Sequence, residues 1–202
     1  MDELNHYPAA KRTTLIGALI NLLLSGIKVV IGILGHSQAL VADGVHSLSD
    51  LISDLLVLYG AKHGGMAADE EHPYGHGRIE TLFTVAIGVL LIAVAIGLGV
   101  DAVQRLFNPE TLTQPEPIIL IAALLSILSK EWLYHYTLSV ANRIHSKLLH
   151  ANAWHHRSDA LSSVVVLVGV IGTMAGLEYL DAIAAVGVSL MIAKAGGELG
   201  WE

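Results

Sequence analysis

Residues 39–59 read ALVADGVHSLSDLISDLLVLY, an apolar stretch about as long as a membrane-spanning helix, which takes around 20 residues. Four polar residues interrupt it at spacings of three, four and four: Asp43, His46, Asp50 and Asp54. This spacing places all four side chains on one face of a helix. A charged group at the bilayer centre costs at least roughly 2.5 kcal/mol on insertion scales. The stripe therefore requires a compensating partner, and a divalent cation suits that need.

The composition of the chain is that of a membrane protein. Hydrophobic residues make up 53% of the 202 residues, mean hydropathy is +0.61, and charged residues are only 14%, about half the usual share. The formal charge of -7 comes partly from carboxylates inside apolar segments, and no basic, aromatic-rich patch suggests binding to nucleic acid. Cysteine is absent, so any metal must be held by nitrogen and oxygen ligands.

Six apolar segments are each long enough to cross a bilayer: residues 13–34, 39–59, 80–103, 117–137, 148–175 and 179–194. The first follows a short polar stretch and has no cleavage-site pattern, so we interpret it as a retained helix rather than a signal peptide. The links at 35–38 and 176–178 are short and predict antiparallel hairpins. The predicted fold is an all-α membrane protein whose residues 1–202 form one six-helix transmembrane domain.

The basic residues between these segments predict the orientation. One side of the predicted topology carries Lys11, Arg12, Lys62, Arg78, Arg143 and Lys147, whereas the links on the other side carry only Arg105. Because lysine and arginine collect on the cytoplasmic side of membrane proteins, we expect both termini in the cytoplasm.

A second polar stripe opens the fifth segment. His155 and Asp159 are four residues apart and share a helical face, as His46 and Asp50 do in the second segment. Two such HxxxD pairs supply two imidazoles and two carboxylates, enough for one tetrahedral ion. Counting 1.5 Å per residue from the nearest turns puts both pairs well inside the membrane.

The remaining polar residues have simpler interpretations. An intramembrane aspartate can pair with a lysine, and Lys28 and Lys130 are available; this alternative weighs more for Asp43 and Asp54 than for the aspartates of the HxxxD pairs. Three further histidines lie outside the predicted ligand set and are interpreted as interfacial or helix-lining residues: His135, His150 and His156. In the first segment, polar side chains either line the transport path or satisfy neighbouring polar groups: Asn21, Ser25 and Lys28.

The link at 69–76 gathers acidic and imidazole side chains in the sequence DEEHPYGH. Pro73 and Gly75 favour a turn, which lets Asp69, His72 and His76 converge. Two interpretations remain open: an exposed metal site that collects ions, and a solvated acidic turn.

Three motifs resemble those of the cation diffusion facilitator (CDF) family. Residues 37–50, SQALVADGVHSLSD, are similar to its second span, and residues 154–159, WHHRSD, are similar to its fifth. Residues 72–80, HPYGHGRIE, resemble the signature of its loop between the second and third spans. Six spans with both ends inside the cell also match the family, and the resemblance covers nearly the whole chain.

This resemblance implies a proton-driven exporter of divalent transition metals rather than an enzyme. It assigns the transport site to four residues: His46, Asp50, His155 and Asp159. Histidine at position 46 resembles the zinc-selective branch, so Zn²⁺ is the expected substrate, with Fe²⁺, Cd²⁺, Co²⁺ and Mn²⁺ as alternatives. The loop site of some bacterial members maps onto Asp69, His72 and His76.

The resemblance also carries expectations about assembly and location. Family members usually have a cytoplasmic C-terminal domain that helps them dimerise. The sequence stops at Trp201-Glu202, about where that domain would begin, so we expect the domain to be absent and a homodimer to be weakened. The expected location is the bacterial inner membrane, with the lipid bilayer, metal ions and protons as partners and no nucleic acid.

Three other classes compete with an exporter. An intramembrane metalloenzyme would keep an open metal position and a general base, as HExxH sites do, but that motif does not occur. A passive channel would favour rings of like groups and weak, multiple sites. A structural scaffold would not need carboxylates within apolar segments.

Overall fold

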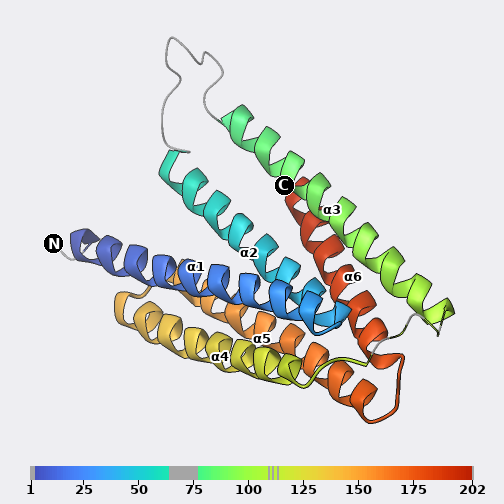
Figure 1. The fold of residues 1–202 in the computed structure, drawn as a ribbon. Coiled ribbons are helices and arrows are strands. Elements are labelled where there is room, and N and C mark those ends of the chain that lie inside the picture. The colour runs from blue at the N-terminus through green and yellow to red at the C-terminus, as the bar shows by residue number, and fades with distance from the viewer. Residues whose placement is uncertain (1–2, 64–76, 109, 111, 113, 202) are drawn as a thin grey trace.

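The computed structural model describes six helices, labelled in Figure 1. The structure describes the backbone of residues 3–63, 77–108, 110, 112 and 114–201. It describes side chains for a smaller set: residues 11–51, 85–108, 110, 112, 114–146 and 149–198. The helices are α1 (Glu3–Leu34), α2 (Gln38–His63), α3 (Gly77–Phe107), α4 (Ile118–Ile144), α5 (Lys147–Met174) and α6 (Leu180–Trp201). In these ranges the regular structure is helical, which confirms the predicted all-α class.

Each of the six predicted apolar segments falls on one helix. Most of the helices extend beyond the predicted segments, because a helical backbone can continue into polar sequence that hydropathy does not mark as membrane-spanning. Five stretches are long and apolar enough to cross a membrane: Lys11–Leu34, Val85–Phe107, Ile118–Ile144, Leu149–Met174 and Leu180–Glu198. These five stretches lie within the described residues, and the side chains of α2 are described only as far as Leu51.

Three of the helix connections meet at one end of the molecule. The backbone N–H of Glu116, before α4, donates to the carbonyl of Gly35 in the α1–α2 turn at 3.0 Å. Ser37 Oγ accepts from the N–H of Leu40 at 3.1 Å and donates to Asp181 of α6 at 2.5 Å, while Asp181 also accepts from the N–H of Gln38 at 2.9 Å. A carboxylate from α6 therefore caps the start of α2, where backbone N–H groups lack helical partners.

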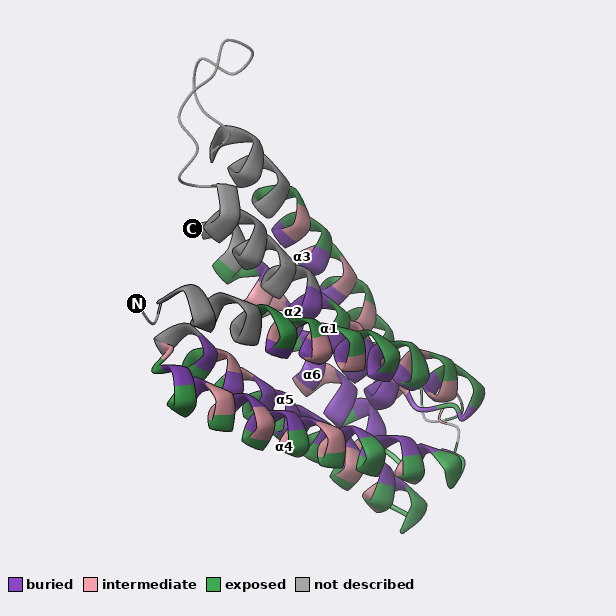
Figure 2. Ribbon diagram, turned by 90° about the vertical axis from the view of Figure 1, so that its left-hand side faces the viewer, coloured by how far each residue is buried: buried purple, intermediate pink, exposed green. Residues whose placement is uncertain are grey.

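The interior of the helical assembly is unusually polar and its exterior apolar. Figure 2 shows buried positions along the faces where helices meet and exposed positions along the outward faces. On α1 the buried face carries Asn21, Ser25 and Lys28, whereas outward positions such as Leu19 and Leu23 are exposed. A protein in lipid needs apolar groups on its outside and can gather polar groups between its helices. The burial pattern therefore fits a membrane domain with a polar centre.

One buried polar cluster joins α1, α2 and α5. Lys28 Nζ lies 2.8 Å from Asp43 Oδ2, and it also donates to Ser47 Oγ at 2.8 Å. Both oxygens of Asp43 accept hydrogen bonds from α5, from Ser162 at 2.8 Å and from Ser163 at 2.7 Å. Since these side chains are fully or almost fully buried, the charge of Asp43 is balanced entirely within the protein. The lysine alternative is thereby confirmed for Asp43.

Gly44 lets α1 and α2 approach closely enough for Lys28 to contact Asp43. A Cβ at Gly44 would lie 2.7 Å from Val29 Cγ2 and 3.0 Å from Lys28 Cβ, closer than side chains tolerate. The hydrogen at this position lets α1 pack directly on α2, as small residues do where membrane helices approach closely. Ser25 Oγ uses the same close approach to donate to the Gly44 carbonyl at 2.6 Å.

We predict that Lys28→Met lowers the free energy of unfolding by about 3–5 kcal/mol, because it leaves the Asp43 carboxylate buried without its counter-charge. Equilibrium unfolding in detergent micelles measures the loss. The double variant Lys28→Met/Asp43→Asn removes both charges and recovers part of it. The exposed Lys194, paired with Glu198 at 3.6 Å, provides the control, and Lys194→Met shifts stability by less than about 0.5 kcal/mol. Equal losses at positions 28 and 194 would contradict the assignment.

Candidate functional site

The two HxxxD pairs come together between α2 and α5. His155 Nε2 of α5 lies 3.9 Å from Asp50 Oδ1 of α2 and 3.8 Å from Asp159 Oδ1 on its own helix. His46 Nε2 lies 3.7 Å from Asp50 Oδ2. The i,i+4 spacing aims both members of each pair toward the facing helix. The predicted convergence of the four side chains is therefore present in the structure.

Three of the four side chains form a compact, buried group. One ligand atom from each of His46, Asp50 and Asp159 lies within 4.8 Å of the other two, and all three residues are buried. The side chain of His155 is 38% exposed and completes the group from its open side. Two ligands held about 2.1 Å from a tetrahedral ion are about 3.4 Å apart. The closest pairs in the site, at 3.7–3.9 Å, are near that separation.

Imidazole nitrogens of the site are available for a ligand. Among the described residues, neither His46 Nδ1 nor His155 Nε2 has a hydrogen-bond partner. A buried polar nitrogen without a protein partner is unfavourable, so such a group in a native protein indicates contact with water or an ion, or a functional role. These nitrogens are the donor type that Zn²⁺ and similar ions bind together with carboxylate oxygens.

A lysine from α4 also reaches the site. Lys130 Nζ lies 2.6 Å from Asp159 Oδ2, and both side chains are buried. Sequence reasoning assigned the lysine alternative chiefly to Asp43 and Asp54 and least to the aspartates of the HxxxD pairs. That weighting was wrong for Asp159. The carboxylate instead serves two partners, with Oδ2 on Lys130 and Oδ1 facing His155.

The two ion pairs lie in neighbouring layers along α5. Ser162 and Ser163, which bond Asp43, follow Asp159 by three and four residues, about 5–6 Å along the helix axis at 1.5 Å per residue. The Lys28–Asp43 pair is therefore the layer nearer the end where the three connections meet. A lysine in the middle of an apolar segment was the sequence signal for the deeper layer.

Aromatic contacts fix α4 against α5 next to this layer. The Tyr134 and Trp154 rings are 5.7 Å apart edge to face, and the Arg157 guanidinium lies 4.7 Å from the Tyr134 ring centre. Both types of contact stabilise packing beyond the area they bury. These contacts fix the alignment of α4 against α5 about one helical turn from the Lys130–Asp159 ion pair.

The histidines outside the ligand set occupy different environments. His156 is buried and lies against α1, where a Cβ at Gly17 would be 3.4 Å from its Nε2. Of the two interpretations given for this residue, its burial excludes the interfacial one and fits the helix-lining one. Neither His156 ring nitrogen nor the Asn21 amide has a hydrogen-bond partner among the described residues. His150 Nε2 lies 2.9 Å from Asn142 Oδ1, and the His135 side chain is exposed.

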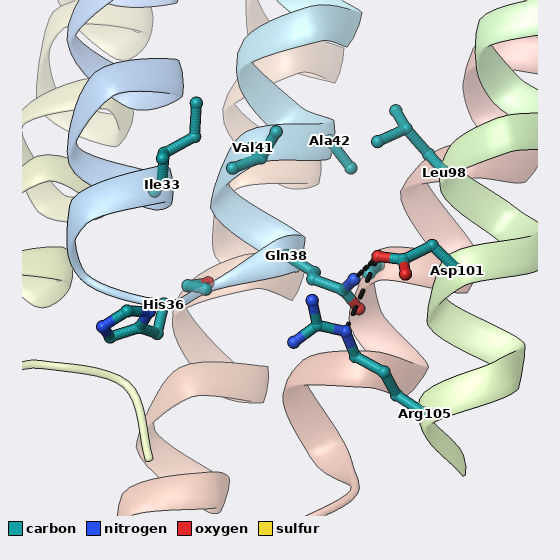
Figure 3. Close-up of a pocket in the computed structure, with 11 residues that line it drawn as sticks. Ile33, His36, Gln38, Val41, Ala42, Leu98, Asp101 and Arg105 are labelled. Atoms are coloured by element: carbon teal, nitrogen blue, oxygen red, sulfur yellow. Dashed lines mark hydrogen bonds and ion pairs between the residues drawn. The ribbon is translucent and has the colours of Figure 1, made fainter. Parts of the chain in front are cut away.

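A cavity of about 250 Å³ lies at the end where the helix connections meet, and Figure 3 shows its lining. The Gln38 amide donates to Asp101 of α3, whose carboxylate lies 3.6 Å from Arg105 Nε. Val41 and Leu98 contribute apolar surface. None of the four predicted ligands lines this cavity, so it is separate from the cluster of His46, Asp50, His155 and Asp159.

Two parts of the prediction fall outside the described residues. The loop residues Asp69, His72 and His76 lie outside the described residues, so the second metal site remains a prediction. The side chain of Asp54 is likewise not described, although α2 continues through that position.

Comparison with known proteins finds one matching family model and several related chains. The family model described as the cation efflux transmembrane domain matches residues 14–202. An uncharacterized transporter of Methanocaldococcus jannaschii is 46% identical over 86% of this chain and 61% of its own length. The magnetosome protein MamB of Magnetospira sp. is 36% identical over 85% of this chain and 58% of its own.

A third relative is named for its metal. The manganese efflux system protein MneP of Bacillus subtilis is 32% identical over 94% of this chain and 66% of its own length. The chain thus spans between 58% and 66% of the length of these relatives.

We predict that cysteines placed at 50 and 155 can be joined by a short bifunctional thiol reagent, because the native side chains approach to 3.9 Å. The chain has no cysteine of its own, so the variant Asp50→Cys/His155→Cys starts from a clean background. Mass spectrometry of the treated protein measures the bridge. The control Asp50→Cys/Leu128→Cys places the second thiol on an exposed position of α4, where no bridge is expected. Failure to bridge 50 and 155 would contradict the convergence of α2 and α5.

Proposed function

Since the chain belongs to the cation efflux family through its transmembrane domain, we propose that it exports divalent transition-metal ions, chiefly Zn²⁺, in exchange for protons. The observation that carries this proposal is the convergence of two HxxxD pairs inside the helical assembly. The proposed ligands of the transported ion are His46, Asp50, His155 and Asp159.

The donor set supports zinc as the substrate. Two imidazoles and two carboxylates match the nitrogen and oxygen ligands of a four-coordinate zinc ion, and neutral histidine favours zinc over calcium or magnesium. Selectivity among first-row metals depends on geometry and availability as well as ligand type. The relative named for manganese efflux makes Mn²⁺ the principal competitor to test.

Exchange for protons follows from the chemistry of these ligands. A metal ion binds neutral imidazole and ionised carboxylate, so loading the site releases protons. Histidine ordinarily titrates near physiological pH, so protons arriving from the opposite side can displace the ion. The same four side chains therefore bind either the metal or protons, which couples the two flows.

The direction of transport is proposed from the orientation of the site. Lys11 and Arg12 in the first half of α1, and Arg143 and Lys147 beside the α4–α5 link, support a cytoplasmic location for the end that carries the termini. His155, the exposed ligand, lies in the half of α5 nearest that end, whereas the Lys28–Asp43 cluster closes the interior toward the other end. This arrangement supports loading from the cytoplasm. The bacterial inner membrane and a homodimer remain the expected setting.

We predict that Asp50→Ala abolishes zinc-driven proton flux in proteoliposomes, because it removes the carboxylate placed between the two histidines. Flux is measured with a pH-sensitive dye trapped in the vesicles. Asp101→Asn changes a carboxylate outside the cluster and keeps at least half of the wild-type rate. Undiminished flux in Asp50→Ala would remove the proposed site.

We predict that His46→Asp widens the accepted metals toward Cd²⁺, because imidazole content contributes to metal preference. The ratio of zinc to cadmium transport in proteoliposomes is the measurement, and we expect it to fall at least several-fold. His135→Asp, on an exposed side chain of α4, is the matched control. An unchanged ratio in His46→Asp would count against His46 as a ligand.

A further inference from the structure

Two lysines are fully buried in the membrane domain, and their surroundings differ. Lys28 has three partners: it contacts Asp43 at 2.8 Å and donates to Ser47 at 2.8 Å and Ser163 at 3.3 Å. Lys130 has one acceptor among the described residues, Asp159 at 2.6 Å. An ammonium group has three N–H donors. The first lysine is thus satisfied within a structural cluster, whereas the second depends on one carboxylate.

That carboxylate belongs to the metal-ligand cluster. Oδ2 of Asp159 contacts Lys130, and Oδ1 faces His155 Nε2 at 3.8 Å. The two oxygens of one carboxylate are therefore divided between a fixed cation and the space for the transported ion. Any ion bound by Oδ1 would lie within a few ångströms of the ammonium, in surroundings that screen charge poorly.

We propose that Lys130 is a tethered competing cation that lowers the affinity of the site for its divalent substrate and holds Asp159 with Oδ1 turned toward the ion. This inference rests on the proposed function. With Asp50 and Asp159 ionised, Lys130 reduces the net charge of the site from two negative charges to one. A divalent ion then exceeds the available negative charge, so its binding is weakened.

Moderate affinity is what a transporter requires. An ion must bind strongly enough to enter the site and weakly enough to leave it in each cycle. Without Lys130, two buried carboxylates would match the charge of the ion and retain it. The lysine also keeps the empty site tolerable in the membrane, because it balances Asp159 when no ion is present.

Zinc titration calorimetry of the purified full chain in detergent tests the inference, using Lys130→Met. We expect its Kd for Zn²⁺ to fall at least tenfold. In proteoliposomes we expect a lower KM together with a lower kcat, because release becomes slow. Lys130→Arg keeps the charge and should restore values near those of the wild type.

A merely structural ion pair gives a different result. If Lys130 only positions Asp159, its removal raises Kd and KM, and either an unchanged or a raised Kd overturns the proposal. Lys130→Met is purified with zinc present, since the ion supplies the missing positive charge. If it still does not fold, Lys130→Gln, which keeps a donor to Asp159 without the charge, is measured against the same criterion.

Two further variants separate this inference from the proposed function. Lys28→Met/Asp43→Asn removes the other buried pair without changing net charge, and we expect its Kd to stay within about threefold of the wild type. His46→Ala tests the site itself. Wild-type binding that does not depend on His46 overturns both proposals. Binding that depends on His46 but does not tighten in Lys130→Met overturns only the competing cation.

Discussion

Charge compensation of buried carboxylates is the constraint on which the membrane domain depends. Asp43 and Asp159 are both buried, and each is matched by a lysine from another helix. An unpaired charge in such surroundings is strongly unfavourable, so these pairs determine which helix faces can meet. The shallower pair joins α1 to α2 and, through two serines, to α5, and the deeper pair joins α4 to α5. The same two ion pairs thus contribute both to the packing of the helices and to the charge around the candidate site.

The two layers differ in what they leave unsatisfied. At the shallower layer every oxygen of Asp43 has a partner, so nothing there invites a ligand. At the deeper layer His46 Nδ1 and His155 Nε2 have no hydrogen-bond partner among the described residues. A fully satisfied polar cluster favours one fixed arrangement, whereas an incomplete one leaves room for a further partner. The same types of residue therefore form a satisfied cluster at one depth and an incomplete one at the other.

Sequence alone was sufficient for the helices and for the convergence of the four side chains proposed as ligands. Apolar length revealed the segments, and the four-residue spacing of His46–Asp50 and His155–Asp159 revealed two polar faces, because both depend only on local helical geometry. The partner of Asp159 could not be obtained in this way. Whether Lys130 reaches that carboxylate depends on how α4 and α5 are aligned, which tertiary packing decides. The same holds for the burial of His156 and for Asp181, which caps a helix far away in the chain.

The cap that α6 provides for α2 has a mechanical consequence. Asp181 and Ser37 anchor the first turn of α2, the helix that bears His46 and Asp50. Asp50 lies about 18 Å from this anchor along the helix axis. A rotation of α2 by about 10° around the anchor would displace Asp50 by about 3 Å, more than the length of a metal–ligand bond. At that distance a slight tilt of α2 would be enough to make or break coordination by the proposed ligands.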